Sequence, residues 1–279
     1  MADLYERSNM RKIKKEKSKK RRSIFSNILL VVCIVVFCYS SYRLIKSGLD
    51  TYKSKKENNK MADIFYGPTP TQTPTVGTTV VATPTPKPET LEEKFTRLTA
   101  INGDIKAWIN VVNTNIDYAV VQASDNDYYL RRNIYKKYSY SGSIFMDYRC
   151  SIWDKPTKNI IIYGHNMKAD TMFHELQKFK KESFFKDESN IITLYTSEGI
   201  VKAKVFSVYI TGITKEDFQY LQATFDDASK YQAYLDTAVS KSKFKSSTSV
   251  YTDDRIITLS TCDYEFDDAR LVVHAKIIQ

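Results

Sequence analysis

The sequence has few of the residues that mark common cofactor and metal sites. Only eight of its 279 residues are glycine, and they form no glycine-rich phosphate loop. No CxxC or HExxH pattern of metal ligands occurs, and no internal repeat is visible. These absences exclude the familiar motif-bearing phosphate and zinc sites. We therefore expect neither a metal nor a cofactor.

A basic folded domain is also missing, although the whole chain carries a net charge of +10. Residues 1–22 hold ten Lys and Arg against three acids, and residues 43–60 hold six against two. Residues 61–279 hold 26 basic and 27 acidic side chains. The charge of the folded part therefore gives no reason to expect a nucleic-acid partner.

Charged residues are absent from the 20 positions between Ser23 and Tyr42. That length is sufficient to cross a bilayer core of roughly 30 Å at 1.5 Å per residue. The basic run before it predicts a cytoplasmic N-terminus and an exported C-terminal bulk. A cleaved signal peptide is the alternative, because the apolar core from Ile28 to Cys38 has only 11 residues and a small-x-small site follows.

Proline is scarce outside one segment, since six of the seven prolines fall between Gly67 and Thr90. This threonine-rich segment cannot bury a core, so we expect an extended, solvated spacer. A stalk after the apolar stretch favours a retained anchor over a cleaved one. We divide the chain into a basic cytoplasmic segment (1–22), a transmembrane signal anchor (23–45), an extracellular Thr/Pro-rich linker (46–90) and one folded domain (91–279).

Short β-rich runs dominate the folded domain. LEEKFTRLTAINGD predicts an opening amphipathic helix, with Asn102-Gly103 as its stop. Eight strands and few helices predict a mostly β fold, a closed or nearly closed barrel. Helical insertions are expected at Thr171–Phe179 and Asp226–Ser242. The runs predicted as strands are WINV, IDYAVVQ, SGSIFMD, NIIIYGH, IITLYT, VKAKVFSVYI, RIITLSTC and RLVVHAKII.

The four cysteines divide by place. Cys33 and Cys38 lie in the apolar stretch and are expected to act as small apolar residues. Cys150 and Cys262 lie in the exported part, where a disulfide is chemically allowed. Such a disulfide would exclude a nucleophilic role for Cys262.

Acidic residues crowd Cys262 on its C-terminal side, namely Asp263, Glu265, Asp267 and Asp268. Acids near a thiol disfavour its thiolate unless a cation offsets them. Arg270 can supply that cation, because seven intervening residues suit a turn that returns the next strand antiparallel. We expect Cys262 and Arg270 to face each other across neighbouring strands.

Histidine is rare, with three residues in the whole chain. His174 falls within a predicted helix and is expected to be a surface or half-buried residue of it. His274 alternates along a strand with Arg270 and is expected to be a structural residue of the barrel. His165 ends the apolar run NIIIY after Gly164, at a strand end where a loop begins. Because a catalytic cysteine needs a base or cation, His165 is the candidate partner of Cys262.

The segment TLSTCDYEFDDARLVVHAK resembles the signature of the sortases, a TLxTC cysteine followed eight residues later by arginine. Its VVHAK continuation is similar to the class B branch, and YGHNM around His165 matches the family's histidine segment. The resemblance covers the whole chain, from the basic N-terminus to the last strand. It implies a closed eight-stranded sortase-type β-barrel with an N-terminal helix and helical insertions, so that residues 91–279 would be the catalytic domain.

The resemblance also implies an activity, that of a cysteine transpeptidase of the Gram-positive cell surface. Cys262 would attack a C-terminal sorting signal and form a thioester. His165 would protonate the departing amine and deprotonate the incoming one, and Arg270 would stabilise the oxyanion or position the substrate. Ser260 and Tyr163 match accessory positions and would line the substrate pocket.

The partners implied by the resemblance are surface proteins with sorting signals related to Asn-Pro-x-Thr, an amine of peptidoglycan precursor or a pilin lysine, and the membrane. Two alternatives belong to other classes. A membrane-anchored extracellular cysteine protease would use the same Cys and His, but arginine in place of an Asn or Asp orienter argues against it. A non-enzymatic surface protein would leave the spacing from TLSTC to Arg270 a coincidence.

Overall fold

The computed structural model describes residues 2–67, 89–154, 156–167, 169–263 and 265–279, and within the first helix it describes the side chains of Met10 and of residues 29–46 and 48–66. The chain forms two compact units, residues 1–50 and residues 51–279. The helices are α1 (Ala2–Tyr66), α2 (Leu91–Ile101), η1 (Tyr128–Arg131), η2 (His174–Lys180), α3 (Glu182–Phe185) and α4 (Ala228–Lys241). The strands are β1 (Ile105–Val111), β2 (Asp117–Val121), β3 (Ile144–Met146), β4 (Asn159–Tyr163), β5 (Asn166–Met167), β6 (Thr171–Met172), β7 (Ile191–Tyr195), β8 (Ile200–Thr211), β9 (Ile256–Cys262) and β10 (Arg270–Ile277).

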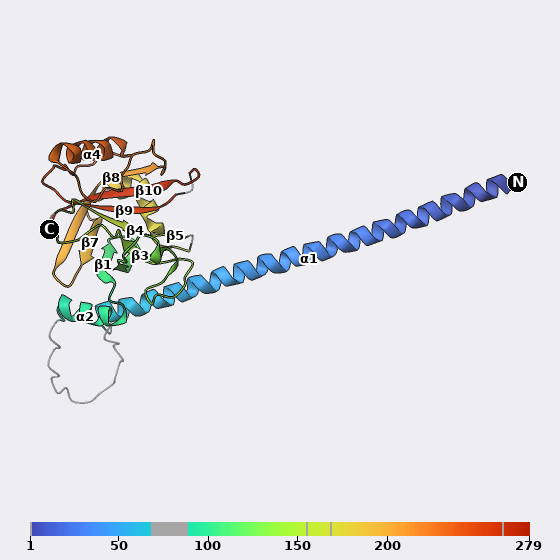
Figure 1. Cartoon of the computed structure of the whole chain (residues 1–279), viewed down its shortest axis with the longest axis horizontal. Helices are drawn as coiled ribbons and strands as arrows, with labels where there is room; N and C mark the ends of the chain where they lie inside the picture. Colours follow the sequence, from blue (N-terminus) through green and yellow to red (C-terminus); the bar gives the residue numbers. More distant parts are fainter. Residues whose placement is uncertain (1, 68–88, 155, 168, 264) are drawn as a thin grey trace, which may run out of the picture. The chain divides into compact units, whose positions relative to one another are not determined.

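Eight strands close into a barrel in the order β1-β2-β3-β4-β9-β10-β8-β7 (Figure 1). Each contains or overlaps one of the eight predicted runs, so the predicted mostly β barrel is confirmed. Most neighbours are antiparallel, but β2 pairs with β3 and β4 pairs with β9 in parallel. Strands buried on both faces explain runs such as NIIIY, in which Ile160, Ile161 and Ile162 are all fully buried.

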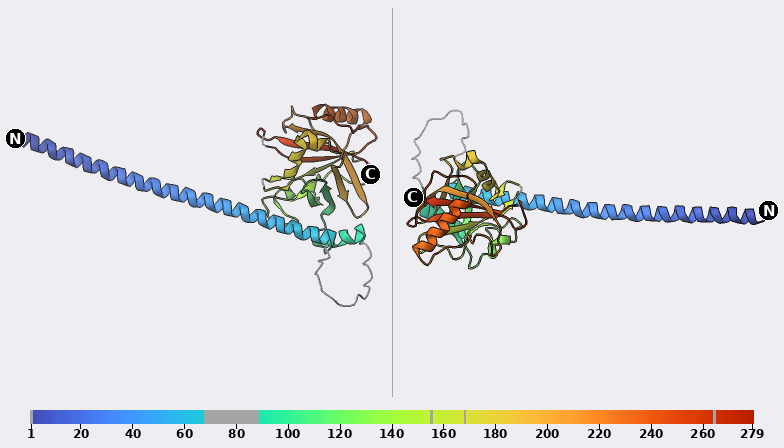
Figure 2. Two further views of the ribbon diagram at one scale, coloured as in Figure 1. Left: turned by 180° about the vertical axis from the view of Figure 1, so that it is seen from behind. Right: turned by 90° about the horizontal axis from the view of Figure 1, so that it is seen from above.

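Two helices cover different sides of the barrel (Figures 1 and 2). Thr90 and Glu93 form a capping box that satisfies backbone N–H groups at the start of α2. On the other side, α4 places Tyr231, Tyr234 and Leu235 against β8 and β9 in a cluster of buried residues. Both predicted helices are therefore confirmed.

The predicted helix at Thr171–Phe179 takes a different form. Thr171 and Met172 form β6, which pairs with β5, and a 3₁₀-helix follows from His174. Phe173, Leu176 and Phe179 are each fully buried at intervals of three residues. Because a 3₁₀-helix has three residues per turn, this spacing puts all three side chains on one face, whereas an α-helix would rotate them apart.

The C-terminal end of α1 differs from the linker expected from residue 46. Residues 51–66 are helical and belong to the same unit as the barrel. Met61 and Phe65 are each only 1% exposed, and Phe65 stacks on Trp108 of β1 at a ring centroid distance of 4.6 Å. Apolar residues at helical spacing in MADIFY give this segment a face that packs on the barrel. The rest of the expected spacer, residues 68–88, lies outside the described residues.

A carboxylate strengthens this contact. One oxygen of Asp117 accepts hydrogen bonds from the Tyr66 hydroxyl (2.7 Å), Trp108 Nε1 (2.8 Å) and Asn110 Nδ2 (3.1 Å). Burial, and then the neighbouring Asp117, raise the pKa of Tyr66 well above its ordinary value. The phenol therefore stays protonated and keeps donating to the carboxylate.

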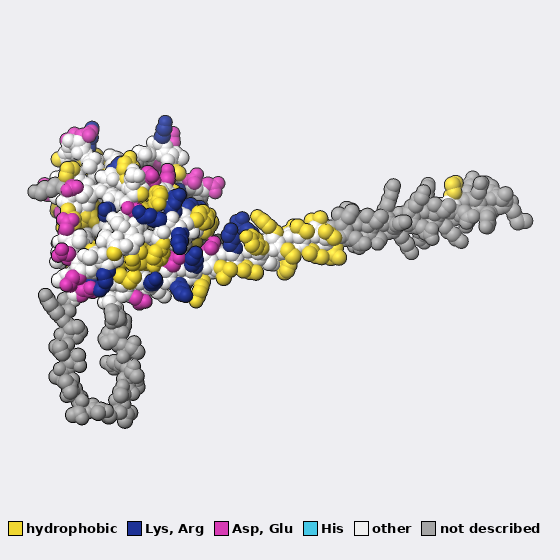
Figure 3. Space-filling view, turned by 60° about the horizontal axis from the view of Figure 1, so that its bottom comes forward, with side chains coloured by type: hydrophobic (Ala, Val, Ile, Leu, Met, Phe, Trp, Pro, Cys, Tyr) yellow, Lys and Arg dark blue, Asp and Glu magenta, His cyan; other side chains and the backbone are white. Residues whose placement is uncertain are grey.

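The other unit contains the candidate membrane span. By length and composition α1 can cross a bilayer, and the large apolar side chains described between Leu29 and Phe37 are more than half exposed. Figure 3 shows this band of hydrophobic side chains on the described part of the helix. An exposed apolar band of this kind is what a lipid-facing helix presents.

We predict that residues 51–279 form the minimal stable unit. A fragment starting at Thr51 should melt cooperatively, whereas one starting at Leu91 should melt about 10 °C lower. Losing two buried apolar side chains lowers the free energy of unfolding by about 3–6 kcal/mol. Each kcal/mol shifts the melting temperature by about 2–4 °C for a domain of this size. Differential scanning calorimetry checks this, with Phe65→Ala in the longer fragment as an intermediate case. Equal melting temperatures for the two fragments would place the domain boundary at residue 91.

Candidate active site

Three neighbouring strands bring the candidate catalytic residues into one row. The parallel register of β4 and β9 pairs Tyr163 with Ser260, so two residues further along each chain His165 lies level with Cys262. Backbone contacts continue past the strand end, since the Gly164 N–H donates to the Ser260 carbonyl at 3.2 Å. On the other side of β9, the antiparallel register pairs Cys262 directly with Arg270. The expected pairing of Cys262 and Arg270 is therefore observed.

A pocket of about 430 Å³ opens over this row. All five residues singled out in the sequence, Tyr163, His165, Ser260, Cys262 and Arg270, line it. Leu130, Phe145 and Leu221 supply apolar walls, and Asn126 adds an amide. The pocket is thus a largely apolar cleft with a thiol, an imidazole and a guanidinium at one edge.

The two cysteines of the barrel unit have different environments. Both are free thiols, so the disulfide between them does not form. Cys262 is partly exposed in the pocket, whereas Cys150 is only 5% exposed and donates to the Asn159 carbonyl at 3.3 Å. Burial raises the pKa of Cys150 to about 11. At neutral pH Cys150 is therefore an inert thiol.

His165 is held in place by its backbone and by its ring. A side chain at Gly164 would come within 2.7 Å of Phe173 Cγ, so only glycine allows the chain to pass here before His165. The ring Nε2 lies 2.9 Å from the Leu130 carbonyl oxygen, and because a carbonyl only accepts, Nε2 carries hydrogen. In the neutral ring Nδ1 is therefore the nitrogen with a lone pair.

The surroundings of His165 favour its neutral form. Burial lowers the pKa of the imidazole below its ordinary value, the hydrogen bond to the Leu130 carbonyl offsets part of this, and the charges of Arg131 and Arg270 lower it further. His165 can thus serve as a base at neutral pH, and its protonated form is a strong acid for an imidazolium.

The cation that pairs with the first acids after Cys262 is Lys180. Its ammonium lies 3.3 Å from Asp263 Oδ2 and 2.7 Å from Glu265 Oε1. Asp263 also accepts from Gln177 Nε2 at 2.9 Å. Burial alone would raise the pKa of Asp263. The hydrogen bond from Gln177 and the charge of Lys180 nevertheless bring this pKa below its ordinary value. The expectation that Arg270 offsets these acids missed Lys180, which looks in the sequence like one member of an ordinary charge run.

The two accessory residues are bound to other side chains. The Ser260 hydroxyl lies 2.8 Å from the Tyr220 hydroxyl, and the Tyr163 hydroxyl donates to Asp147 Oδ2 at 2.8 Å. Asp147, which sequence reasoning did not single out, has a fully buried carboxylate. In the sequence, the only indication of a role for Asp147 is that this acid directly follows the apolar run of β3.

The remaining histidines lie apart from the row. His274 is fully buried, and both of its ring nitrogens are hydrogen-bonded. The Thr258 hydroxyl donates to Asn159 and therefore accepts from Nδ1 of His274. The Tyr209 hydroxyl donates to Nε2 of His274. Burial lowers the pKa of His274 to about 3, so it is neutral. His174 contacts Asn166 and Asp170 from η2 with its side chain 30% exposed. Neither lines the pocket around Cys262.

Comparison with known proteins gives a consistent result. The family model described as the sortase domain matches residues 109–278. A curated relative, sortase B of Listeria monocytogenes, is 33% identical over 267 residues, which cover 93% of this chain and 99% of the relative.

Solved structures are similar as well. Sortase B of Clostridium perfringens shares 42% identity, with a TM-score of 0.62 and coverage of 66% of this chain and all of the other. A Staphylococcus aureus sortase B–substrate complex shares 36% identity, with a TM-score of 0.62 and coverage of 68% of this chain and 87% of the other.

We predict that the His165 ring titrates with a midpoint below 6.5, because the neutral form is favoured by burial and by two positive neighbours. Arg131→Gln removes one of these charges and should move the midpoint upward. An NMR titration of the ring protons, in the fragment starting at Thr51, measures both. Arg132→Gln is the control, because Arg132 contacts the Tyr128 ring and carbonyl. A midpoint above 6.5, or a downward shift with Arg131→Gln, would contradict the assigned electrostatics.

Proposed function

Because the chain belongs to the sortase family, in its class B branch, we propose that it cleaves a C-terminal sorting signal of surface proteins and transfers the new carboxyl group to an amine. The observation that supports this most is the row of His165, Cys262 and Arg270 at the ends of three adjacent strands, at the edge of one pocket. A nucleophile, a proton carrier and a fixed cation are the groups that acyl transfer requires.

The first half of the reaction forms an acyl-enzyme. The Cys262 thiolate attacks the carbonyl carbon of the scissile peptide bond, and negative charge develops on the oxygen. The Arg270 guanidinium stabilises this oxyanion or holds the substrate carbonyl. The C–N bond then breaks, the departing amine takes a proton from the His165 imidazolium, and a thioester on Cys262 remains.

The second half reverses these roles with a different amine. Neutral His165 accepts a proton from the incoming amine as its nitrogen attacks the thioester carbon. The C–S bond breaks, and the Cys262 thiolate leaves. Since Nε2 is occupied by the Leu130 carbonyl, Nδ1 of His165 is the atom that exchanges the proton. Protons and electrons balance over the two steps with these side chains and the two amines alone.

The pocket suits an extended peptide. Its apolar walls, Leu130, Phe145 and Leu221, would bury side chains of the sorting signal, while Ser260 and Tyr163 would line its polar side. A similar protein, sortase B of Staphylococcus aureus, has been solved as a substrate complex. We propose a signal related to Asn-Pro-x-Thr, and an amine of peptidoglycan precursor or a pilin lysine as the acceptor.

The place of action follows from the N-terminal helix. We propose that residues 23–45 remain in the membrane as a single-pass anchor, with residues 1–22 in the cytoplasm and the barrel outside the cell. Enzyme and membrane-tethered substrate would then share one surface. Their effective concentration would be high, so that slow turnover suffices.

The central test is whether the acyl group reaches an amine. The fragment starting at Thr51, incubated with a peptide library built on Asn-Pro-x-Thr, should release the C-terminal piece and hold the N-terminal piece as a thioester visible by mass spectrometry. Added hydroxylamine should divert the product from acid to hydroxamate. Cys262→Ala should abolish both cleavage and thioester formation. Cys150→Ala should retain activity within about twofold, because Cys150 lies outside the row.

The outcome separates the alternatives. Cleavage that yields only free acid at any amine concentration would indicate a cysteine protease. Absence of both cleavage and thioester in the unsubstituted fragment would leave a non-enzymatic surface protein.

Arg270→Lys tests the role of the guanidinium. Arginine presents a planar fork, whereas lysine presents one flexible point charge, so the variant should keep its melting temperature and lose about 100- to 1000-fold in kcat, as expected when an oriented oxyanion donor is lost. Steady-state kinetics and calorimetry on the same preparation measure both quantities. Activity within about threefold of the parent would mean that Arg270 acts only as a counter-charge, worth about 1 kcal/mol or less.

A further inference from the structure

Two of the pocket's walls come from connections rather than from strands, whereas Phe145 belongs to β3. Asn126 and Leu130 lie between β2 and β3, and Leu221 lies between β8 and α4. Strand pairing does not fix the backbone in either connection. Some other contact must hold these walls at a set separation if the pocket is to fit one kind of peptide.

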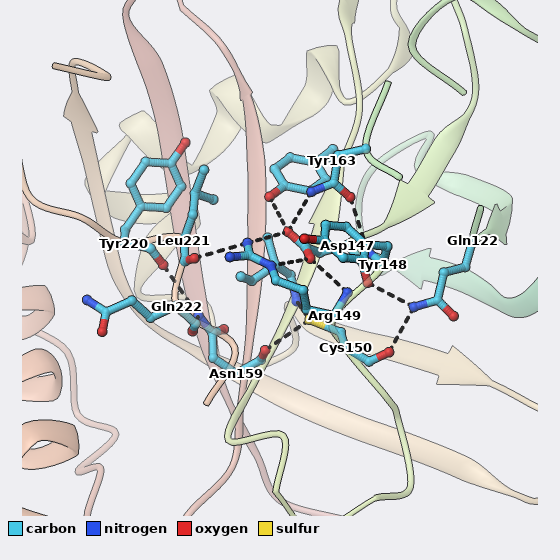
Figure 4. Close-up of polar contacts among 12 residues, drawn as sticks. Gln122, Asp147, Tyr148, Arg149, Cys150, Asn159, Tyr163, Tyr220, Leu221 and Gln222 are labelled. Atoms are coloured by element: carbon cyan, nitrogen blue, oxygen red, sulfur yellow. Dashed lines mark hydrogen bonds and ion pairs between the residues drawn. The ribbon is translucent and has the colours of Figure 1, made fainter. Parts of the chain in front are cut away.

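A single buried carboxylate contacts the first wall and Tyr163 of β4, which also lines the pocket. Asp147 Oδ2 accepts from Asn126 Nδ2 at 2.9 Å and from the Tyr163 hydroxyl at 2.8 Å. The Arg149 fork binds the same carboxylate, with Nε at 2.8 Å and Nη2 at 2.7 Å (Figure 4). The Asp147 side chain is fully buried, so these donors replace the water that the carboxylate loses.

Arg149 reaches from this carboxylate to the second wall. Its Nη2 also donates to the Leu221 carbonyl at 3.2 Å, and Figure 4 shows the guanidinium between Asp147 and Leu221. The neighbouring carbonyls are held as well: Asn159 Nδ2 donates to Gln222 at 2.9 Å, and the Tyr234 hydroxyl donates to Tyr220 at 2.8 Å. Of these donors, only Arg149 joins this segment to the wall that contains Asn126.

We propose that Asp147 and Arg149 are positioning residues that hold the two walls of the substrate pocket at a fixed separation and so determine how tightly the sorting signal binds. This inference rests on the proposed function, because it assigns a role within that peptide-binding pocket. It adds a pair of residues that touch neither the nucleophile nor its partners in the row.

The position of the pair predicts which kinetic constant responds. Neither Asp147 nor Arg149 lines the pocket, so neither meets the reacting atoms. Loosening the walls weakens the binding of substrate and of transition state alike, which raises KM and leaves kcat unchanged.

The charges of the pair do not change with pH. Arg149 remains charged at every working pH. Although burial raises the pKa of Asp147, the hydrogen bonds from Arg149 bring that pKa below its ordinary value. The link between the walls is therefore permanent rather than a pH switch.

The test is Arg149→Lys in the fragment starting at Thr51. Lysine keeps the charge near Asp147 but cannot bind the carboxylate with two nitrogens and also reach Leu221. We expect KM for the cleaved peptide to rise about tenfold, as for loss of a hydrogen bond to a charged group, with kcat within about twofold. Amide hydrogen exchange of residues 218–225 should also become faster, which is a readout independent of activity.

A matched control exists on another side of the barrel. Arg97 likewise binds a carboxylate, that of Glu89, through two nitrogens and donates to a backbone carbonyl, that of Ile64. Arg97→Lys should leave KM and the exchange of residues 218–225 unchanged. Any general effect of an arginine-to-lysine change would appear in both variants.

The outcomes distinguish this inference from the proposed function. If the unsubstituted fragment forms no thioester, the function fails, and faster exchange in Arg149→Lys alone would still support the structural link. If the fragment is active and Arg149→Lys changes neither KM nor exchange beyond the Arg97→Lys control, the inference is overturned. A fall in kcat at constant KM would also overturn it, because it would place Arg149 in the chemical step.

Discussion

The parallel pairing of β4 with β9 is the constraint on which the site depends. Their register sets His165 level with Cys262, and the antiparallel pairing of β9 with β10 then adds Arg270 on the far side. A shift of one residue along β9 would turn Cys262 to the other face of the sheet and separate it from both partners. The row is thus built from backbone hydrogen bonds of the barrel, which are rigid on the time scale of a chemical step.

Acidic side chains near the row of His165, Cys262 and Arg270 form ion pairs with basic residues close to them. Lys180 pairs with Asp263 and Glu265 at the β9–β10 turn, and Arg149 pairs with the buried Asp147 behind the pocket. These three acids are therefore paired with Lys180 or Arg149, and Arg270 faces the pocket. Burial, and to a smaller extent the charges of Arg131 and Arg270, lower the pKa of His165 and favour its neutral form.

The strands and the pairing of Cys262 with Arg270 could be predicted from the sequence, because both are local. Alternating and continuous apolar runs mark all eight strands, and the short turn between Cys262 and Arg270 makes their pairing nearly obligatory. His165 was expected only at a strand end, since parallel pairing between residues 97 positions apart leaves no local signal.

Three features were not predicted, for a related reason: the roles of Lys180 and Asp147, and the packing of residues 51–66 on the barrel. A charge run and a short apolar stretch look the same whether or not they have tertiary partners. The three-residue spacing of Phe173, Leu176 and Phe179 is visible in the sequence, but over so few residues it also fits the α-helix that we expected.

The contact between the ends of α1 and α2 bears on protein engineering. Arg97 of α2 donates to the Ile64 carbonyl of α1 at 2.6 Å, and Phe65 and Phe95 lie 6.2 Å apart between ring centroids. The described residues on either side of the 68–88 segment therefore lie side by side on one surface of the barrel, and a chain that joins them closes a loop. Closing a loop costs only about 0.6 kcal/mol more for each doubling of its length. A reporter domain or affinity tag inserted there would be carried by the folded enzyme at little thermodynamic cost, far more safely than one fused within either helix.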